Sequence, residues 1–433
     1  MSKINIIRGF ADLYEPESTL YTFMENTARR VFGAYGYREL RVPIVEYTEL
    51  FRRSIGTETD VVQKEMYTFP DRKDRSLTLR PECTAGIVRS YIENNLHSRG
   101  DVSKFLSFGP MFRYERPQKG RMRQFHQIDC ECLGAHEPQV DAEVILMLMH
   151  YMHELGLSEL KPEINTLGCA QCRPGYRKTL TEFLRGLDPE SLCENCRRRL
   201  ETNPMRVLDC KVPSCKEQTE NAPRILDHVC GPCDEHFKVV LRILDARSIP
   251  YELNPRLVRG LDYYARTTFE MVSTTIGSQG SVAGGGRYDG LVSQLGGPEV
   301  PGIGFACGME RLALMLADKE SAGAVVRPDF YIAMLASEAA DTALEAAQSL
   351  REAGLCGEMS FEAKSLKSQL RQASRVNADY CMIMGQEELA ARNIIVKHMD
   401  SGDQVTIPLV SLKDWAEIRY DDKLQRQRKG SCR

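Results

Sequence analysis

One stretch of this chain, Met111–Cys132 with the sequence MFRYERPQKGRMRQFHQIDCEC, constrains the fold more than any other. It predicts a strand, a charged loop and a second strand. Lys104–Arg113 is rich in residues that favour strands, and the polar segment after it, with a proline and a glycine, is typical of a loop. Arg123–Leu133 then alternates with period two, which predicts a strand whose two faces differ.

The two faces of this second strand carry different side chains. One face holds Phe125, Gln127, Asp129 and Glu131, and the other holds His126, Ile128, Cys130 and Cys132. A half-buried strand usually turns its polar face to water, so a solvated edge hairpin is one of two interpretations of this pattern. The loop, however, adds Arg116, Lys119, Arg121 and Arg123. Cations beside two acids and an amide would also suit a ligand that has both a phosphate and an amine.

Composition limits the class of protein. The 433 residues are enough for two or three domains, and 42% hydrophobic and 27% charged residues are ordinary for a soluble globular chain. A net charge of −3 gives no global basic field, so any nucleic-acid binding would have to use local patches. The sequence has no N-terminal apolar segment and no run of about 18 apolar residues, so we expect a cytoplasmic protein that is neither secreted nor inserted in a membrane.

Two segments before the hairpin indicate an interface and a binding group. Tyr21–Tyr35 has the apolar spacing of a helix, and Tyr37–Ile44 is expected as a strand, which Pro43 places at a sheet edge or a subunit contact. In LTLRPECTAGIVR a short strand runs into a turn, and a helix begins near Thr84. Glu82 at this turn is either a helix cap or a carboxylate that receives an ammonium group.

Cysteines dominate the chain after a helix that is expected over Gln139–Leu155. Eight of the fifteen cysteines fall in one window: Cys169, Cys172, Cys193, Cys196, Cys210, Cys215, Cys230 and Cys233. Four thiolates close a structural zinc site, so two Zn²⁺ sites are possible, with His228 and His236 as substitute ligands. The alternative is a set of reduced, buried cysteines, and the sequence leaves the pairing open. The basic residues of this window form either a solvated helix face or a phosphate-contacting one: Arg197, Arg198, Arg199, Arg206 and Lys211.

Three later segments place glycines and cations. In LVRGLDYYARTTFE, Arg259 precedes Tyr263 and Tyr264, which would point opposite ways on a strand. The three glycines of SVAGGGRYDGL allow close approach of a ligand or a strand, but the segment lacks the G-x-G-x-x-G spacing of a dinucleotide site. In GIGFACGMERLALMLAD a strand turns at Gly308 into a helix. Arg311, in its first turn, opposes the helix dipole and so either meets an anion or is exposed.

A domain boundary is expected at Lys319–Pro328, followed by a small α/β domain. Its strands are expected at Asp329–Leu335, Tyr380–Met384, Asn393–Lys397 and Gln404–Leu409, and its helices at Glu338–Ala353 and Ala363–Asn377. The second of these helices and the chain end are basic, through Lys364, Lys367, Arg371, Arg375, Lys423, Arg426, Arg428, Lys429 and Arg433. Contact with RNA and exposure to solvent are equally compatible with that pattern.

In this order the segments resemble those of the histidyl-tRNA synthetases, which are class II aminoacyl-tRNA synthetases. Tyr35–Phe51 resembles class II motif 1, Phe112–Glu131 motif 2 and Gly304–Leu312 motif 3, while LVRGLDYY and GGGRYDGL resemble two histidine-specific signatures. The resemblance implies an α+β fold. A catalytic domain at 1–325, with an antiparallel sheet flanked by helices, would be interrupted by the Cys-rich insertion at 168–240, and an α/β anticodon-binding domain would span 326–433.

The resemblance also implies an activity: a histidine–tRNA ligase that uses ATP and Mg²⁺ to form histidyl-adenylate and transfers histidine to tRNA(His). The implied catalytic cations are Arg113, Arg259 and Arg311, and the implied ATP contacts are Arg113, Arg121 and Arg311. L-Histidine would be bound by Glu82, Thr84, Arg113, Gln127, Glu131, Arg259, Tyr263 and Tyr264. A homodimer formed through motif 1 is also implied, with no membrane partner.

Two features depart from the family pattern, and one alternative function stays open. Cys83 stands where the family usually has the glycine of RPEGT, and the Cys-rich insertion is unlike that of the best-known members. The alternative is a catalytically inactive regulatory subunit of histidine biosynthesis. Such paralogues tend to lose the arginines and the C-terminal domain, both of which this chain keeps. A zinc-dependent RNA-binding module would explain only the insertion.

Overall fold

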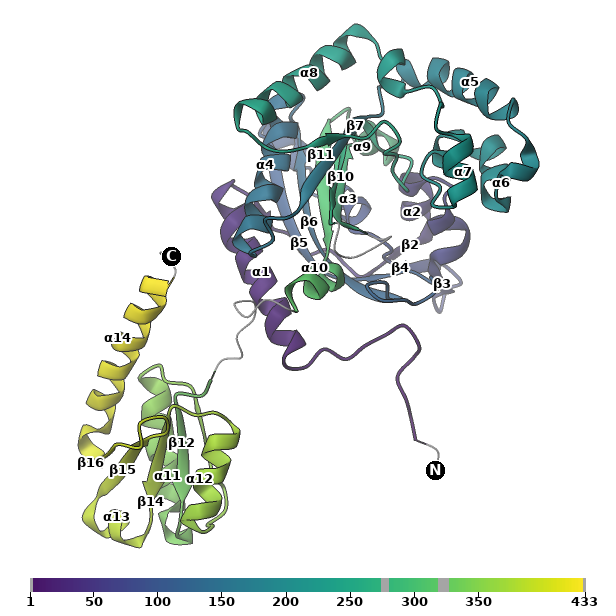
Figure 1. Ribbon diagram of the computed structural model, residues 1–433. Coiled ribbons are helices and arrows are strands. Elements are labelled where there is room, and N and C mark those ends of the chain that lie inside the picture. The colour runs from purple at the N-terminus through teal and green to yellow at the C-terminus, as the bar shows by residue number, and fades with distance from the viewer. Residues whose placement is uncertain (1–2, 274–279, 318–326, 431–433) are drawn as a thin grey trace. The chain divides into compact units, whose positions relative to one another are not determined.

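Residues 3–273, 280–317 and 327–430 are described by a computed structural model, without the side chains of 426–430 (Figure 1). The chain divides into two units, Met1–Ala324 and Val325–Arg433. Most of the expected boundary at Lys319–Pro328 lies outside the described residues. The same holds for Arg433 and for the side chains of Arg426, Arg428 and Lys429 in the basic tail.

An eight-stranded mixed sheet forms the centre of the first unit. Its strand order is β1 (Arg38–Glu39), β5 (Ser103–Phe112), β6 (Gln124–Leu133), β11 (Gly302–Gly308), β10 (Ser281–Arg287), β9 (Ala265–Val272), β7 (Lys161–Thr166) and β8 (Glu252–Leu253). The neighbours from β5 to β7 pair antiparallel, and only the two edge strands, β1 and β8, pair parallel. The expected antiparallel sheet is therefore confirmed, with a parallel strand added at each edge.

The predicted hairpin is the β5–β6 pair, with register from Ser103↔Leu133 to Phe112↔Gln124. The apolar face of β6 packs into the main core against α1 (Glu17–Ala34), α4 (Pro138–Glu154) and α10 (Met309–Leu316). The expectation that its polar face meets water is wrong, because Asp129 and Glu131 are each only 1% exposed. The turn at Glu82 and the start of α3 (Thr84–Glu93) cover that face.

The strand expected at Tyr37–Ile44 is much shorter in the structure. Only Arg38–Glu39 pairs, as edge strand β1 alongside β5. Pro43 has no N–H to donate, which prevents a continuous ladder through this segment. The chain then enters a separate three-stranded sheet of β2 (Val45–Tyr47), β4 (Ser76–Leu79) and β3 (Tyr67–Pro70), beside α2 (Thr48–Ile55).

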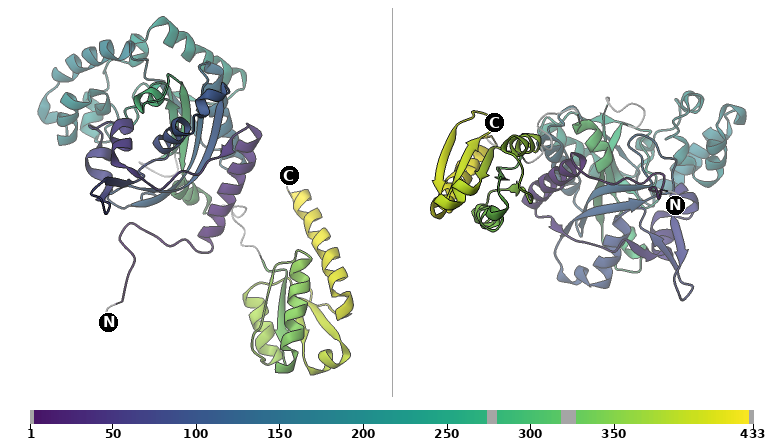
Figure 2. Two further views of the ribbon diagram at one scale, coloured as in Figure 1. Left: turned by 180° about the vertical axis from the view of Figure 1, so that it is seen from behind. Right: turned by 90° about the horizontal axis from the view of Figure 1, so that it is seen from below.

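The Cys-rich insertion is helical. It contains α5 (Cys172–Arg185), α6 (Glu194–Thr202), α7 (Pro213–Gln218) and α8 (Gly231–Ala246), joined by short turns that include η4 (Pro204–Val207). Figures 1 and 2 show these helices as an arc, and the last of them, α8, lies beside α4. The α8 side chains Phe237, Val240 and Leu244 join the main core, so this end of the insertion is continuous with the first unit.

The second unit is a five-stranded sheet with helices on both faces. The order is β13 (Gly357–Met359), β12 (Phe330–Met334), β14 (Tyr380–Met384), β15 (Asn393–His398) and β16 (Gln404–Pro408). One core lies under α11 (Ala340–Glu352) and α14 (Leu412–Gly430), and a second lies under α12 (Leu366–Arg375). The expected alternation of strand and helix holds only partly, because β14, β15 and β16 pair antiparallel, with only the short helix α13 (Gln386–Ala391) between β14 and β15. Among the described residues, no helix has the length and apolarity needed to cross a membrane.

Candidate active site

A cavity of about 920 Å³ opens over the polar face of the main sheet. Nine of the ten residues that the sequence nominated for histidine or ATP line it: Glu82, Thr84, Arg113, Arg121, Gln127, Arg259, Tyr263, Tyr264 and Arg311. They come from four segments that are far apart in the sequence. The tenth, Glu131, does not line the cavity and lies behind its wall.

Glu82 has the capping contact that was one of the two interpretations of its sequence context, and it also lines the cavity. Its Oε1 accepts a hydrogen bond from the N–H of Ala85 at 3.0 Å, so it caps helix α3. Its Oε2 accepts a hydrogen bond from the Tyr263 hydroxyl at 3.5 Å. Burial raises the pKa of Glu82, against the lowering effect of the backbone hydrogen bonds at Ala85 and Thr84. The group is therefore costly to ionise unless a cation comes close.

Glu131 organises the wall behind the cavity. It accepts hydrogen bonds from the Thr84 hydroxyl at 2.5 Å and from the Tyr288 hydroxyl. A Cβ atom at Gly304, on the facing strand β11, would collide with the Glu131 carboxylate, so only glycine fits at that position. Burial raises the pKa of Glu131 well above its usual range.

The two adjacent tyrosines do not point opposite ways, which corrects the expectation from the sequence. Strand β9 begins at Ala265, so Tyr263 and Tyr264 lie in the loop before it and escape the alternation of a strand. Their ring centroids are 4.6 Å apart, and both rings line the cavity. Both side chains are buried.

Three arginines bring positive charge to the cavity. The Nη1 of Arg259 donates to Oε1 of Glu270, and its guanidinium lies 5.1 Å from the Tyr264 ring centroid. Arg113 donates from Nε to the Pro81 carbonyl at 2.9 Å. Arg311 donates to the carbonyls of Gly120 and Ser281, and burial together with Arg121 lowers its pKa. These partly buried cations are held by backbone carbonyls or by Glu270, and their remaining N–H groups are available for an anion.

The glycine triplet meets a side chain on one side and a strand on the other. A Cβ atom at Gly284 would collide with the Arg259 guanidinium, and one at Gly285 would collide with the Gly304 carbonyl on β11. The close approach of a strand that the sequence suggested therefore occurs at Gly285, whereas at Gly284 the approaching group is the Arg259 side chain. The next residue, Arg287, is fully buried away from the cavity and donates to Asp141, Asp289 and the Ala135 carbonyl.

The eight cysteines of the insertion form two groups of four. One group is Cys169, Cys172, Cys230 and Cys233, and the other is Cys193, Cys196, Cys210 and Cys215. Within each group the sulfur atoms lie within 4.8 Å of one another. The structure thus resolves the pairing that the sequence left open, since each Cys-x-x-Cys pair at the start of a group meets a distant pair.

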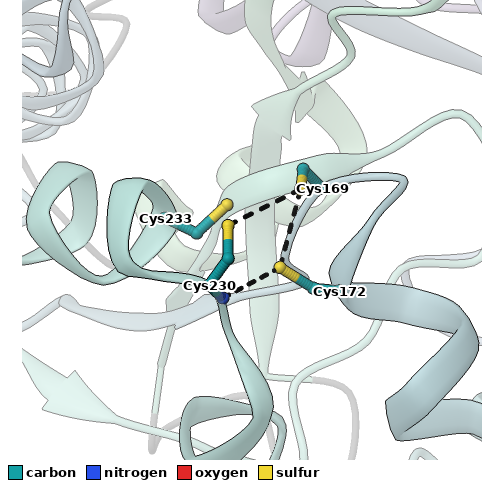
Figure 3. A group of neighbouring side chains, drawn as sticks. All are labelled: Cys169, Cys172, Cys230 and Cys233. Atoms are coloured by element: carbon teal, nitrogen blue, oxygen red, sulfur yellow. Dashed lines mark hydrogen bonds between the residues drawn. The ribbon is translucent and has the colours of Figure 1, made fainter.

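Figure 3 shows the first group, with the four sulfur atoms facing a common centre. The Sγ of Cys169 is 3.5 Å from that of Cys172 and 3.9 Å from that of Cys230. The N–H of Cys230 donates to Sγ of Cys172 at 3.1 Å, an arrangement that favours a thiolate. The two histidines considered as substitute ligands are engaged elsewhere: His236 contacts Asp141 at 2.8 Å, and the ring of His228 packs on Tyr176.

Several basic residues of the insertion lie at or near the cavity. Arg198 and Arg199 both contact Asp60, which lies outside the insertion, at 3.0 and 2.8 Å. Arg199, Arg206 and Lys211 also line the cavity. These side chains therefore do not form a purely solvated helix face.

Comparison with known proteins adds the family. Residues 9–312 match the family model described as histidyl-tRNA synthetase, and residues 329–418 match the one described as anticodon binding domain. The chain belongs to the histidyl-tRNA synthetase family. A protein named histidine–tRNA ligase from Nitratidesulfovibrio vulgaris is 64% identical over 94% of this chain and 97% of its own length.

Solved structures agree with this family. The apo histidyl-tRNA synthetase of S. aureus is 36% identical, covers 96% of this chain and 100% of its own, and has a TM-score of 0.79. A Bacillus halodurans structure titled ATP phosphoribosyltransferase regulatory subunit/histidyl-tRNA synthetase is 20% identical, with a TM-score of 0.61, over 86% of this chain and 97% of its own. That likeness shows a shared fold alone, so the regulatory alternative gains less support than the ligase.

Cys83, the departure from the family motif, fits its site. Its φ is −101°, so the position needs no glycine, and its buried thiol donates to the Ser107 hydroxyl at 3.5 Å. Sequence reasoning missed other side chains that the structure brings to the site: Asp129, Glu270, Tyr288 and Glu310. Asp129 was visible as a member of the polar face of β6. Nothing in the sequence pairs Tyr288 with Glu131.

Proposed function

We propose that this cavity carries out both steps of a class II histidine–tRNA ligase. L-Histidine would react with ATP to give histidyl-adenylate, and the histidyl group would then pass to the 3′ end of tRNA(His). The observation that carries the proposal is the convergence of Arg113, Arg259 and Arg311 with buried acids in one cavity of a chain that belongs to this family. These three arginines also argue against an inactive regulatory subunit.

The cations would serve the phosphate chemistry. A carboxylate oxygen of histidine attacks the α-phosphorus, a new P–O bond forms, and the bond to pyrophosphate breaks. Arg113 would contact the α-phosphate, Arg121 and Arg311 the other phosphates, and Arg259 the charge that develops in the transition state. Planar and permanently charged guanidinium groups suit these tasks, and no protein nucleophile is required.

The acids and tyrosines would bind histidine. Glu82, Thr84 and Gln127 would receive the α-ammonium group, while Glu131, Tyr263 and Tyr264 would form the imidazole pocket. For Glu131 to accept a ring N–H, the imidazole must reach this carboxylate behind the cavity wall, where the Thr84 and Tyr288 hydroxyls already donate to it. A site built on such hydrogen bonds rejects apolar isosteres, because an unpaired buried polar group costs about 1–3 kcal/mol.

Mg²⁺ fits the donor set at the ATP end. Glu115 and Glu270 line the cavity beside the arginines and offer carboxylate oxygens, and Mg²⁺ is usually held by one or two such groups together with substrate phosphates. These two glutamates are our proposed protein ligands. When bound, Mg²⁺ would neutralise phosphate charge and so help pyrophosphate to leave.

Zn²⁺ is our proposal for the two four-cysteine groups. Four thiolates with no open position are the ligand set of a structural zinc site rather than a catalytic one. Each group joins segments that are separated in the sequence, so metal would stabilise the fold of the insertion. All fourteen cysteines that the structure describes are free, as a reducing compartment requires, and we place the chain in the cytoplasm.

A homodimer is part of the proposal. Ile44, Val45, Tyr47 and Phe69 are apolar side chains between 38% and 51% exposed, on or next to the small sheet of motif 1. Exposed apolar groups that gather in one region are typical of a subunit contact. Light scattering on the purified chain measures its mass directly, and a mass of one chain at micromolar concentration would contradict the dimer.

Histidine-dependent exchange between ATP and pyrophosphate tests the central proposal. The folded chain with Mg²⁺ should incorporate labelled pyrophosphate into ATP when histidine is present and not when it is omitted. Addition of tRNA(His) should then give histidyl-tRNA and AMP. Absence of exchange in a folded, metal-loaded preparation would contradict the ligase and favour the regulatory alternative.

A further inference from the structure

Three buried oxygen acceptors face the histidine end of the cavity, and one of them has no assigned role. Gln127 and Asp129 lie two residues apart on β6, about 7 Å along the same face of the strand, and Glu82 covers that face from the turn before α3. All three line the cavity. Within the described part of the chain, Gln127 Oε1 and Asp129 Oδ2 are buried without a hydrogen-bond partner.

Asp129 has no ion-pair partner in the part of the chain that the structure describes, although the charges of Arg80 and Arg113 act on it. The nearest buried cation, Arg80, is held by the carbonyls of Pro110 and Val42, at 2.9 and 3.2 Å. Neither Arg80 nor Arg113 forms an ion pair with Asp129 among the described residues. A buried carboxylate without a cation is expensive, and chains keep such groups where a ligand completes them.

We propose that Asp129 is a further specificity-determining residue, which binds the α-ammonium group of the amino-acid substrate together with Glu82 and Gln127. An ammonium group has three N–H donors, and Asp129 adds a charged acceptor to the oxygens that Glu82, Gln127 and the Thr84 hydroxyl offer in the same cavity. The ammonium group also supplies the positive charge that the two neighbouring carboxylates, Glu82 and Asp129, need. The inference rests on the proposed function and deepens it, since it adds a residue to the histidine site.

The electrostatic environment of Asp129 favours a role in binding a cationic ligand over a purely structural role. Burial raises the pKa of Asp129 to about 8, with a smaller contribution from the neighbouring Glu82, although Arg80 and Arg113 act to lower it. In the absence of a ligand the carboxyl therefore tends to keep its proton. An arriving ammonium group would replace that proton as the positive partner, which a neutral or anionic ligand could not do.

The test compares Asp129→Asn with wild type in histidine-dependent exchange. Asparagine keeps the size and one acceptor oxygen but removes the charge. The KM for histidine should rise tenfold or more, while the KM for ATP should stay within about twofold. Cys132→Ala, on the opposite face of the same strand, is the matched control and should change neither constant. An unchanged KM for histidine in a folded Asp129→Asn variant would overturn the inference.

A substrate analogue separates charge recognition from a general packing role. 3-(Imidazol-4-yl)propionate has the ring and the carboxylate of histidine but no amine, so its inhibition constant should be unchanged or lower in Asp129→Asn. The ratio of the inhibition constant of the analogue to the KM for histidine should therefore fall about tenfold. A loss of affinity that is equal for both ligands would contradict the proposal. Failure of the proposed function itself would look different, because wild type would then show no exchange.

Discussion

Arg259 and Glu270 form a partly buried pair in the cavity wall, in which the arginine Nη1 donates to the glutamate Oε1. The same guanidinium lies over the Tyr264 ring. Gly284 has no Cβ and so leaves the space that the guanidinium occupies. Burial alone would lower the pKa of Arg259, but the facing Tyr264 and Glu270 outweigh that effect and raise it. The cation is thus fixed in place before any substrate arrives, as electrostatic stabilisation of a transition state requires.

Arg259→Ala should remove adenylate formation while the chain still folds. We expect exchange to fall by about 10²–10³-fold, because a fixed cation at the reacting phosphate is lost. Single-turnover formation of histidyl-adenylate measures this step directly. Arg242→Ala is the matched control: this arginine is exposed on α8 and does not line the cavity, so exchange should stay near the wild-type rate. Near wild-type exchange in Arg259→Ala would rule out the role that we propose.

The raised pKa of Asp129 predicts a pH-dependent gain in stability when its charge is removed. The unfolded chain releases this proton near pH 4 and the folded chain keeps it to about pH 8, so ionisation of the carboxyl makes the wild type less stable as pH rises between those values. Arg80, Glu82, Arg113 and the Cys83 thiol face the group and are shared by both proteins. Asp129→Asn should therefore have the higher Tm at pH 8.5, with a smaller advantage at pH 5.

Calorimetry at the two pH values, without histidine, provides the measurement. A Tm difference that is the same at both values would show that the substitution acts through packing and not through charge. A gain in stability together with a loss of histidine affinity would mark Asp129 as a group kept for binding at a cost in stability.

The sequence predicted secondary structure and the types of residue in the site better than it predicted which side chains contact one another. The hairpin, the helix over α4 and most strands of the second unit follow from periodicity, which is a local signal. The burial of Asp129 and Glu131 could not be predicted from periodicity, because the turn that covers them, at Glu82, comes from a distant part of the sequence. The Tyr263 and Tyr264 prediction failed for a related reason: alternation applies only inside a strand, and β9 begins one residue later.

Long-range pairing was the other limit of the sequence. The spacing of the cysteines allowed several pairings, and only the fold brings Cys169 next to Cys230. His236 was a candidate ligand by type, yet Asp141 binds it instead. Most nominated cavity residues were nevertheless found, because the family motifs encode positions that spacing alone does not.

Arg287 supports the fold rather than the chemistry, and its removal should destabilise the chain. It is fully buried and donates to Asp141, Asp289 and the Ala135 carbonyl. Arg287→Ala leaves Asp141 buried without its main cation, so the free energy of unfolding should fall by about 3–5 kcal/mol. Urea unfolding measures the change. Arg30→Ala breaks an exposed ion pair with Glu154 and should cost less than about 1 kcal/mol. Equal effects from the two variants would contradict this account.

Metal content gives the most direct test of the insertion. If both four-cysteine groups hold zinc, purified chain washed with a weak chelator should retain about two equivalents, because closed tetrathiolate sites release metal slowly. Cys172→Ser and Cys196→Ser each remove one ligand from a different group, so each should retain about one equivalent and unfold at a lower temperature. Cys356→Ser is the matched control, since Cys356 is exposed and belongs to neither group, and it should retain two equivalents.

Atomic emission on the four proteins measures the zinc content of each. Less than half an equivalent in the wild type would exclude structural zinc, and one equivalent lost only in Cys172→Ser would restrict the metal to the first group.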